Sequence, residues 1–142
     1  MTEPGAAGST GPLLLVEDDE SLRLIVARHL RSHGFTVEEA ASAEEAESRL
    51  ADGCRPALVL LDLNLPGGTG WDLLRGAALG AAGNPAVVIT SATTVSPRRL
   101  AEFRVAGYLP KPFPLETLIA TIERVISTEE QSPRPRAISR SS

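Results

Sequence analysis

The segment LLLVEDDESLR, residues 13–23, changes abruptly from apolar to acidic residues. Its first four residues form an unbroken apolar run, which is typical of a strand buried on both faces of a parallel sheet. Four acidic residues, 17–20, follow the run directly. A helix is indicated next, because apolar residues recur at the spacing of one helix face until Gly34: Leu22, Ile25, Val26 and Leu30. The segment therefore predicts a strand, an acidic loop and a helix.

The same succession of strand and helix repeats along the chain. We predict further strands at residues 35–37, 57–61, 86–89 and 107–109, and further helices at residues 43–50, 71–79, 97–105 and 114–126. Ser42 with Glu45 makes a capping-box pattern before the second helix, and Ser96-Pro97 is a typical start for the fourth. Five strands that alternate with five helices predict an α/β fold: a doubly wound five-stranded parallel sheet with helices on both faces.

Polar residues stand at the predicted carboxyl ends of four strands, where parallel sheets bind their ligands. Glu17 and Asp18 follow the first strand, Asp62 the third, Thr90 the fourth and Lys111 the fifth. Clustered carboxylates repel one another unless a cation is present, and Mg²⁺ prefers such oxygen ligands. A lysine and a hydroxyl beside them suit the oxygens of a phosphoryl group. These residues together indicate phosphoryl transfer to a carboxylate.

Composition excludes several other classes of protein. The chain has 142 residues, 42% hydrophobic and 23% charged, which is ordinary for one globular domain. No apolar run reaches the roughly 18 residues of a membrane span, and residues 1–11 lack the basic residues of a signal peptide. The formal net charge of −4 argues against a general nucleic-acid binder. The single cysteine, Cys54, excludes intrachain disulfides and cysteine-based zinc sites, and it fits a cytoplasmic location.

The two ends of the chain differ in composition from the part between them. Residues 1–11 are dominated by Gly, Ala, Ser and Thr and predict a flexible leader. Residues 128–142 are rich in Ser, Arg and Pro and predict a disordered tail. We expect one domain at residues 12–127.

Four motifs in their order and spacing resemble the receiver domain of two-component response regulators. They are LLLVEDDESLR (13–23), LVLLDLNLPGGTGWDLL (58–74), VVITSA (87–92) and GYLPKPF (107–113). The resemblance covers residues 13–126, and it implies the flavodoxin-like fold of that family.

The resemblance implies a role for each acidic residue at the strand ends. Asp62 would accept the phosphoryl group, Asp18 would bind Mg²⁺ directly, and Glu17 would assist through water. Asp62 would also be a ligand of the metal, and Asn64 would contribute its backbone carbonyl.

It also implies roles for three residues of the last two strands. Lys111 would pair with the acyl phosphate, Thr90 would move toward the phosphoryl group, and Tyr108 would repack inward in response. The bond between Lys111 and Pro112 would be cis.

The function implied is a phosphorylation-activated switch rather than an enzyme with an external substrate. The donor would be a sensor histidine kinase or a phosphotransfer protein, and output would pass through an unknown partner protein or by onward phosphotransfer. We expect a stand-alone receiver, because the residues after 127 are too few for a DNA-binding effector; direct DNA binding and membrane association are not expected.

Two alternatives stay open. The chain could be one receiver taken from a hybrid kinase or a larger regulator. It could instead be a phosphohydrolase with an aspartyl nucleophile, although such enzymes typically carry two acids in one motif after the first strand, whereas the nucleophile proposed here ends the third.

Some polar residues have simpler interpretations. Asp19 and Glu20 suit the positive amino end of a helix. His29 and His33 have a spacing that could bind metal, but a third ligand is needed. Asn64 could orient a water that hydrolyses an aspartyl phosphate, whereas Ala92 offers no polar group, so we expect slow dephosphorylation.

Overall fold

The computed structural model describes residues 11–65 and 70–131, with side chains up to residue 128. The predicted leader therefore lies outside the described residues except for Gly11. Most of the predicted tail lies outside them as well. None of the helices in the described part of the chain is long and apolar enough to cross a membrane.

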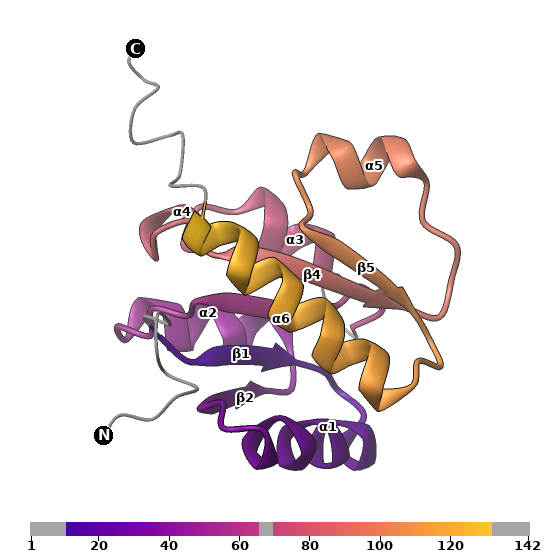
Figure 1. Ribbon diagram of the computed structural model, residues 1–142. Coiled ribbons are helices and arrows are strands. Elements are labelled where there is room, and N and C mark those ends of the chain that lie inside the picture. Colours follow the sequence, from indigo (N-terminus) through magenta and orange to yellow (C-terminus); the bar gives the residue numbers. More distant parts are fainter. Residues whose placement is uncertain (1–10, 66–69, 132–142) are drawn as a thin grey trace.

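Five parallel strands form one sheet, as the sequence predicts (Figure 1). They are β1 (Leu13–Val16), β2 (Val37–Ala40), β3 (Leu58–Asp62), β4 (Ala86–Ser91) and β5 (Gly107–Pro110), in the spatial order β2-β1-β3-β4-β5. From β1 the chain first adds β2 on one side, and it then adds β3, β4 and β5 in turn on the other side. The direction in which strands are added therefore reverses between β1 and β3. The carboxyl ends of β1 and β3 thus lie side by side at the switch point where such sheets bind ligands.

Helices cover both faces of this sheet. They are α1 (Glu20–Ser32), α2 (Ala43–Ala51), α3 (Gly70–Arg75), α4 (Ala78–Ala81), α5 (Pro97–Glu102) and α6 (Leu115–Gln131). Successive strand residues point to opposite faces, so Leu13 and Leu15 of β1 pack with α1 and α6. Leu14 and Val16 pack with α2, α3 and α4 on the other face. The fold is the predicted doubly wound α/β fold.

Side-chain caps define the starts of three helices. Asp19 Oδ1 accepts the backbone N–H of Leu22 at 3.1 Å, which confirms a helix-terminus role for Asp19. Ser42 Oγ accepts the N–H of Glu45 at 3.0 Å, and the Glu45 carboxylate accepts the N–H of Ala41 at 2.8 Å. Ser96 caps α5 in the same way, with Pro97 at the first helical position. These caps satisfy N–H groups that have no partner inside the helix.

The prediction for the second strand was wrong in position. We expected residues 35–37, but β2 is Val37–Ala40 and contains Glu38 and Glu39. The two glutamates are tolerated because β2 is an edge strand, where side chains reach solvent. Phe35 instead precedes the strand and packs against the core on the α1 and α6 side.

The third and fourth predicted helices are shorter than expected. In place of one helix at 71–79, α3 ends at Arg75 and α4 begins at Ala78. Gly76 lies at this break, and glycine disfavours a helix interior by about 1 kcal/mol relative to alanine. The helix predicted at 97–105 ends at Glu102, and Arg104 has left-handed backbone (φ 56°) that a helix cannot continue.

Two further details of the helices differ from prediction. The last helix continues to Gln131, into the segment predicted as a tail. In α1, Ile25 is 54% exposed although we placed it on the buried face, which is made instead by Val26, Ala27 and Leu30. Residues 25 and 26 differ by about 100° around a helix, and only Val26 points toward the sheet.

Candidate functional site

Four charged side chains meet at the carboxyl ends of the strands, and we call them the strand-end cluster: Glu17, Asp18, Asp62 and Lys111. Glu17 and Asp18 follow β1, Asp62 is the last residue of β3, and Lys111 follows β5. The parallel pairing extends just beyond the strands, since the Glu17 N–H bonds to the Ala40 carbonyl at 3.0 Å and the Lys111 N–H to the Ser91 carbonyl at 2.8 Å. The backbone itself therefore brings these residues together.

Lys111 bridges two buried carboxylates in this cluster. Its Nζ lies 2.9 Å from Glu17 Oε1 and 3.2 Å from Asp62 Oδ2. The Asp62 and Glu17 side chains are only 2% and 5% exposed, and that of Lys111 is 19% exposed. Since a buried charge is costly without a partner, one ammonium group serves as the partner of both carboxylates.

The three acids are also placed to bind a cation. One carboxylate oxygen from each of Glu17, Asp18 and Asp62 lies within 4.8 Å of the others, and Asp18 faces solvent. Three carboxylates against one lysine leave an excess of negative charge at an open rim. Hard oxygen ligands with room for water suit Mg²⁺, so the residues present fit this ion.

Burial and charge alter the acidity of two groups in the strand-end cluster. Desolvation raises the pKa of Glu17 above its ordinary value of 4.5, and the nearby Asp62 charge adds to this, despite the opposing effects of Lys111 and the Asp19 N–H. Burial alone would lower the pKa of Lys111, but its bonds to Glu17 and the charges of both acids outweigh burial and raise it. Lys111 therefore stays protonated at neutral pH.

The architecture and the sequence match one family. The response regulator receiver domain family matches residues 13–123. The chain belongs to this family. Receiver domains are signalling modules of two-component systems rather than enzymes that turn over an external substrate.

Individual relatives of this receiver agree with the family assignment. It is 30% identical over 129 residues to the DNA-binding transcriptional regulator NtrC of Salmonella typhimurium, which covers 90% of this chain and 27% of NtrC. It is 34% identical over 121 residues to response regulator MprA of a Mycobacterium species, which covers 80% of this chain and 50% of MprA. The receiver thus spans half or less of these curated relatives.

Solved structures carry the same fold. Chemotaxis protein CheY4 of Vibrio cholerae superposes with a TM-score of 0.72 at 30% identity, over 82% of this chain and 99% of that one. A CheY-like receiver domain of Methanospirillum hungatei gives a TM-score of 0.78 at 22% identity, over 87% and 98% of the two chains, and supports the fold alone.

The two residues expected to act in switching, Thr90 and Tyr108, lie on the receiver's last two strands. Thr90 is buried and pairs in register with Asp62 across β3 and β4. Tyr108 of β5 is half-buried, and its hydroxyl donates to the Thr93 carbonyl at 3.3 Å. The peptide bond between Lys111 and Pro112 is cis, as the resemblance implies.

Asn64 joins the loops that follow β3 and β4. Its N–H donates to Asp62 Oδ1 at 3.0 Å, and its side-chain Oδ1 accepts from Ser91 Oγ at 3.1 Å and from the Ala92 N–H at 3.2 Å. Ser91, which is 1% exposed at the end of β4, is not among the site residues predicted from the sequence. The sequence feature that could have identified it is a polar residue in a strand that is otherwise mainly apolar and buried.

His29 of α1 and His33, the residue that follows this helix, lie side by side. Their ring centroids are 4.8 Å apart, and His33 Nδ1 contacts the His29 carbonyl. Among the described residues, Glu17, Asp18 and Asp62 are the group of acids, histidines or cysteines close enough to hold an ion. The third ligand that a histidine site needs is therefore missing from this part of the chain.

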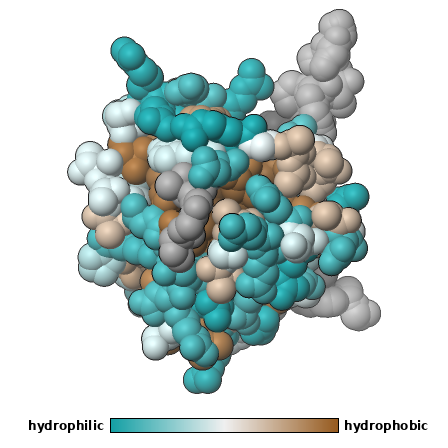
Figure 2. All heavy atoms as spheres, turned by 180° about the vertical axis from the view of Figure 1, so that it is seen from behind, coloured by the Kyte–Doolittle hydropathy of each residue, from teal (hydrophilic) through white to brown (hydrophobic). Residues whose placement is uncertain are grey.

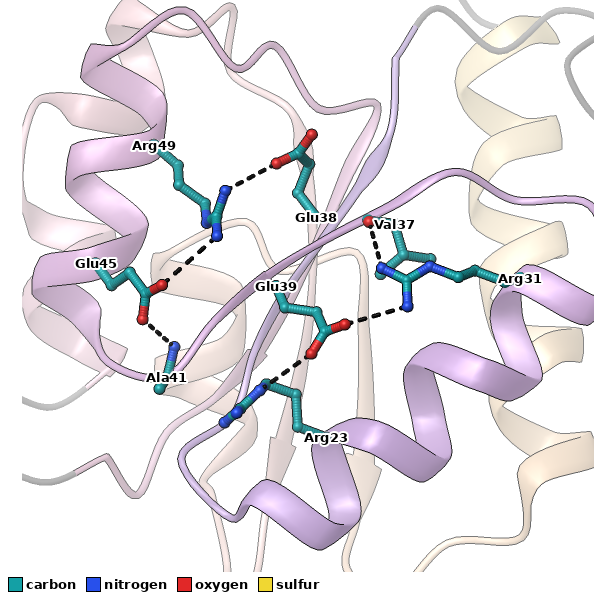
Figure 3. A pocket seen from close by; sticks show the side chains of 8 residues that line it. All are labelled: Arg23, Arg31, Val37, Glu38, Glu39, Ala41, Glu45 and Arg49. Carbon is teal, nitrogen blue, oxygen red and sulfur yellow. Dashed lines mark hydrogen bonds and ion pairs between the residues drawn. The ribbon is translucent and has the colours of Figure 1, made fainter.

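A second group of charges lies along the free edge of β2, and we call it the edge cluster: Arg23, Arg31, Glu38, Glu39, Glu45 and Arg49. It lines a pocket of about 400 Å³ together with Val37 and Ala41 (Figure 3). Glu39 pairs with Arg23 and Arg31, both at 3.2 Å, and Arg49 pairs with Glu38 at 2.9 Å. None of the strand-end acids lines this pocket.

Proposed function

We propose that this receiver accepts a phosphoryl group on Asp62 from a phosphohistidine of a sensor histidine kinase or phosphotransfer protein. The observation that carries the proposal is the placement of Asp62. It is a buried carboxylate at the switch point, with Lys111 Nζ 3.2 Å from one oxygen and two further acids beside it. This placement supplies the nucleophile, a cation and oxygen ligands in one small volume.

In the proposed reaction, an Asp62 oxygen forms a bond to phosphorus while the nitrogen–phosphorus bond of the donor histidine breaks. Mg²⁺, when bound, neutralises the phosphoryl oxygens. Glu17, Asp18 and Asp62, with the Asn64 backbone carbonyl, would hold the ion. Lys111 is bound to Asp62 before the reaction and would remain as the partner of a phosphoryl oxygen.

We propose that Thr90 and Tyr108 convert this event into a signal. Thr90 is the register partner of Asp62, so its hydroxyl is a candidate donor to a new phosphoryl oxygen. Tyr108 holds the Thr93 carbonyl in the loop that leads to α5. A shift of that loop would alter the surface of α5 and β5, where an output partner would bind.

The partners and the compartment follow from the proposed chemistry. Two-component signalling suits the cytoplasm, and output would pass through a partner protein or by onward phosphotransfer, with neither DNA nor a membrane bound directly. We assign the receiver to residues 12–127, with α6 continuing beyond them. The curated relatives carry additional chain beyond the matched part, so a receiver taken from a larger regulator remains the alternative.

The proposed acceptor is tested by phosphorylation with acetyl phosphate and Mg²⁺, followed by intact-mass measurement. We expect the wild type to gain one phosphoryl group and Asp62→Asn to gain none. Asp52→Asn, an exposed carboxylate at the end of α2, is the matched control and should react like the wild type. Uptake by Asp62→Asn at the wild-type level would show that another residue is the acceptor.

A further inference from the structure

Ser91 lies at the centre of a group of hydrogen bonds directly beside the proposed phosphorylation site. Its Oγ accepts the Thr93 N–H at 3.0 Å and lies 3.1 Å from Asn64 Oδ1 and 3.0 Å from the Thr93 carbonyl oxygen. The residue is 1% exposed, so these contacts cannot be replaced by bulk water. Neither the family match nor the roles assigned above give this side chain a function.

The donors and acceptors can be assigned from chemistry. The Ala92 backbone N–H points at the Asn64 side chain at 3.2 Å and can only donate, so the Asn64 atom there is the carbonyl oxygen. A serine hydroxyl has one proton to donate. Two carbonyl oxygens lie within its reach, Asn64 Oδ1 at 3.1 Å and the Thr93 carbonyl at 3.0 Å, and we assign the proton to Asn64 Oδ1.

With the Ser91 proton assigned in this way, the carbonyl oxygen of Asn64 accepts two hydrogen bonds. It has two lone pairs, one facing Ser91 Oγ and the other facing the Ala92 N–H. The backbone of Asn64 is held as well, because its N–H donates to Asp62 Oδ1. The side chain next to the acceptor carboxylate is therefore turned toward the loop after β4.

We propose that Ser91 is a positioning residue that keeps Asn64 Oδ1 from orienting a hydrolytic water and so prolongs the phosphorylated state. This inference rests on the proposed phosphorylation of Asp62. It changes the sequence-based interpretation of Asn64, in which the side chain was free to orient that water.

The step affected is hydrolysis of the aspartyl phosphate. A water oxygen bonds to phosphorus, the bond from phosphorus to the Asp62 oxygen breaks, and the carboxylate and inorganic phosphate are released, with the water proton passing to phosphate. The attacking water must present a lone pair to phosphorus, so its protons need acceptors. While Ser91 donates to Asn64, the nearest side-chain carbonyl has no free lone pair.

The test is the decay of phosphorylated protein after removal of acetyl phosphate at fixed Mg²⁺. We expect Ser91→Ala to decay about fivefold faster, the rate ratio corresponding to one ordinary hydrogen bond. Ser91→Cys, which keeps a donor at this position but a weaker and larger one, should lie between. The double variant Ser91→Ala with Asn64→Ala should return to the rate of Asn64→Ala alone, because the acceleration acts through Asn64.

Thr93→Val is the matched control. It removes the hydroxyl that lies 3.0 Å from Ser91 Oγ but leaves the bond between Ser91 and Asn64 in place. Its decay should equal that of the wild type. If Ser91→Ala accelerates decay equally with and without Asn64, or if Thr93→Val accelerates it as much, the effect is general loosening of the loop and the inference is overturned.

A measurement without phosphate tests the same geometry. Hydrogen exchange of the Ala92 amide should be slow in the wild type and in Ser91→Ala, and fast in Asn64→Ala, which removes its acceptor. Equal exchange in all three would overturn the proposed bonding. A wild-type chain that takes up no phosphoryl group would overturn the function proposed for Asp62 as well, whereas normal uptake with identical decay in every variant would overturn the role of Ser91 alone.

Discussion

The strand-end cluster and the edge cluster are both built from opposite charges, but they differ in balance and in burial. The edge cluster has three arginines and three glutamates from α1, β2 and α2, and their side chains are between 16% and 49% exposed (Figure 3). The strand-end cluster has three acids and one lysine, and two of its acids are almost completely buried. The charges of the edge cluster balance, whereas the strand-end cluster carries an excess of negative charge.

This difference indicates what each cluster is for. Glu38 and Glu39 hold arginines from both neighbouring helices along the free edge of β2, and Arg31 Nη2 donates to the Val37 carbonyl at 2.8 Å. An edge carbonyl that is covered in this way cannot pair with another strand. Charge at the strand-end cluster is instead left uncompensated where a ligand can reach it.

One residue connects the two clusters. Arg23 donates from Nε to Glu39 at 3.2 Å and from Nη1 to the backbone carbonyl of Glu17 at 2.9 Å. The edge cluster thereby supports the loop that carries the first two acids. Seen from behind the view of Figure 1, the surface is mainly hydrophilic, with hydrophobic residues in small groups between the hydrophilic ones (Figure 2).

The largest expected difference is in stability when a cation is removed. Lys111→Met leaves Glu17 and Asp62 buried without their partner, and we expect it to lower the free energy of unfolding by about 3 kcal/mol. Arg49→Met is the control from the edge cluster and should cost at most about 1 kcal/mol, because its partners are solvent-exposed. Denaturant unfolding without Mg²⁺ measures both; equal losses would contradict the comparison.

The next difference concerns Mg²⁺. Binding to the strand-end acids should stabilise the folded chain by about 1.4 kcal/mol when Mg²⁺ is at roughly ten times its Kd. Asp18→Ala should abolish this gain and Glu17→Gln should reduce it. Glu38→Gln, in the edge cluster, should leave the gain unchanged; thermal unfolding with and without Mg²⁺ distinguishes these cases, and a gain retained in Asp18→Ala would rule out the metal site.

A smaller difference should appear as a dependence on pH. Burial raises the pKa of Glu17 above 4.5, so the folded state binds this proton more tightly than the unfolded state. The stability from this group is complete below pH 4.5 and is lost as pH rises through the folded pKa. The free energy of unfolding of Glu17→Gln, relative to that of the wild type, should therefore rise as pH rises through the folded-state pKa of Glu17. Denaturant unfolding in EDTA at several pH values measures this difference. An opposite trend would mean that Lys111 outweighs burial.

The smallest effect is expected within the edge cluster itself. Glu38→Gln breaks its pair with Arg49, and we expect a loss of about 0.5 kcal/mol. The loss should disappear at about 1 M NaCl, because salt screens exposed charges. A loss that persists at high salt would show that this pair behaves like the buried pairs of Lys111.

Much of the fold could be predicted because local patterns and the tertiary structure agree. The apolar run at β1 and the caps at Ser42 and Ser96 occur where expected. The wrong predictions lie where packing overrides a local pattern. Glu38 and Glu39 form a strand at the edge of the sheet, and Ile25 is exposed because Val26, Ala27 and Leu30 make the buried face of α1.

By itself, the sequence determined the alternation of strands and helices and the polar residues that end each strand, because both are written in local runs of the chain. Only the tertiary structure decided which of those residues meet. Lys111 contacts Glu17 across 94 positions of sequence, since parallel strands bring their carboxyl ends to one edge. The contact between Ser91 and the Asn64 side-chain carbonyl is also set by the tertiary structure alone. It depends on how the chain segments after β3 and β4 are placed, which no local sequence pattern specifies.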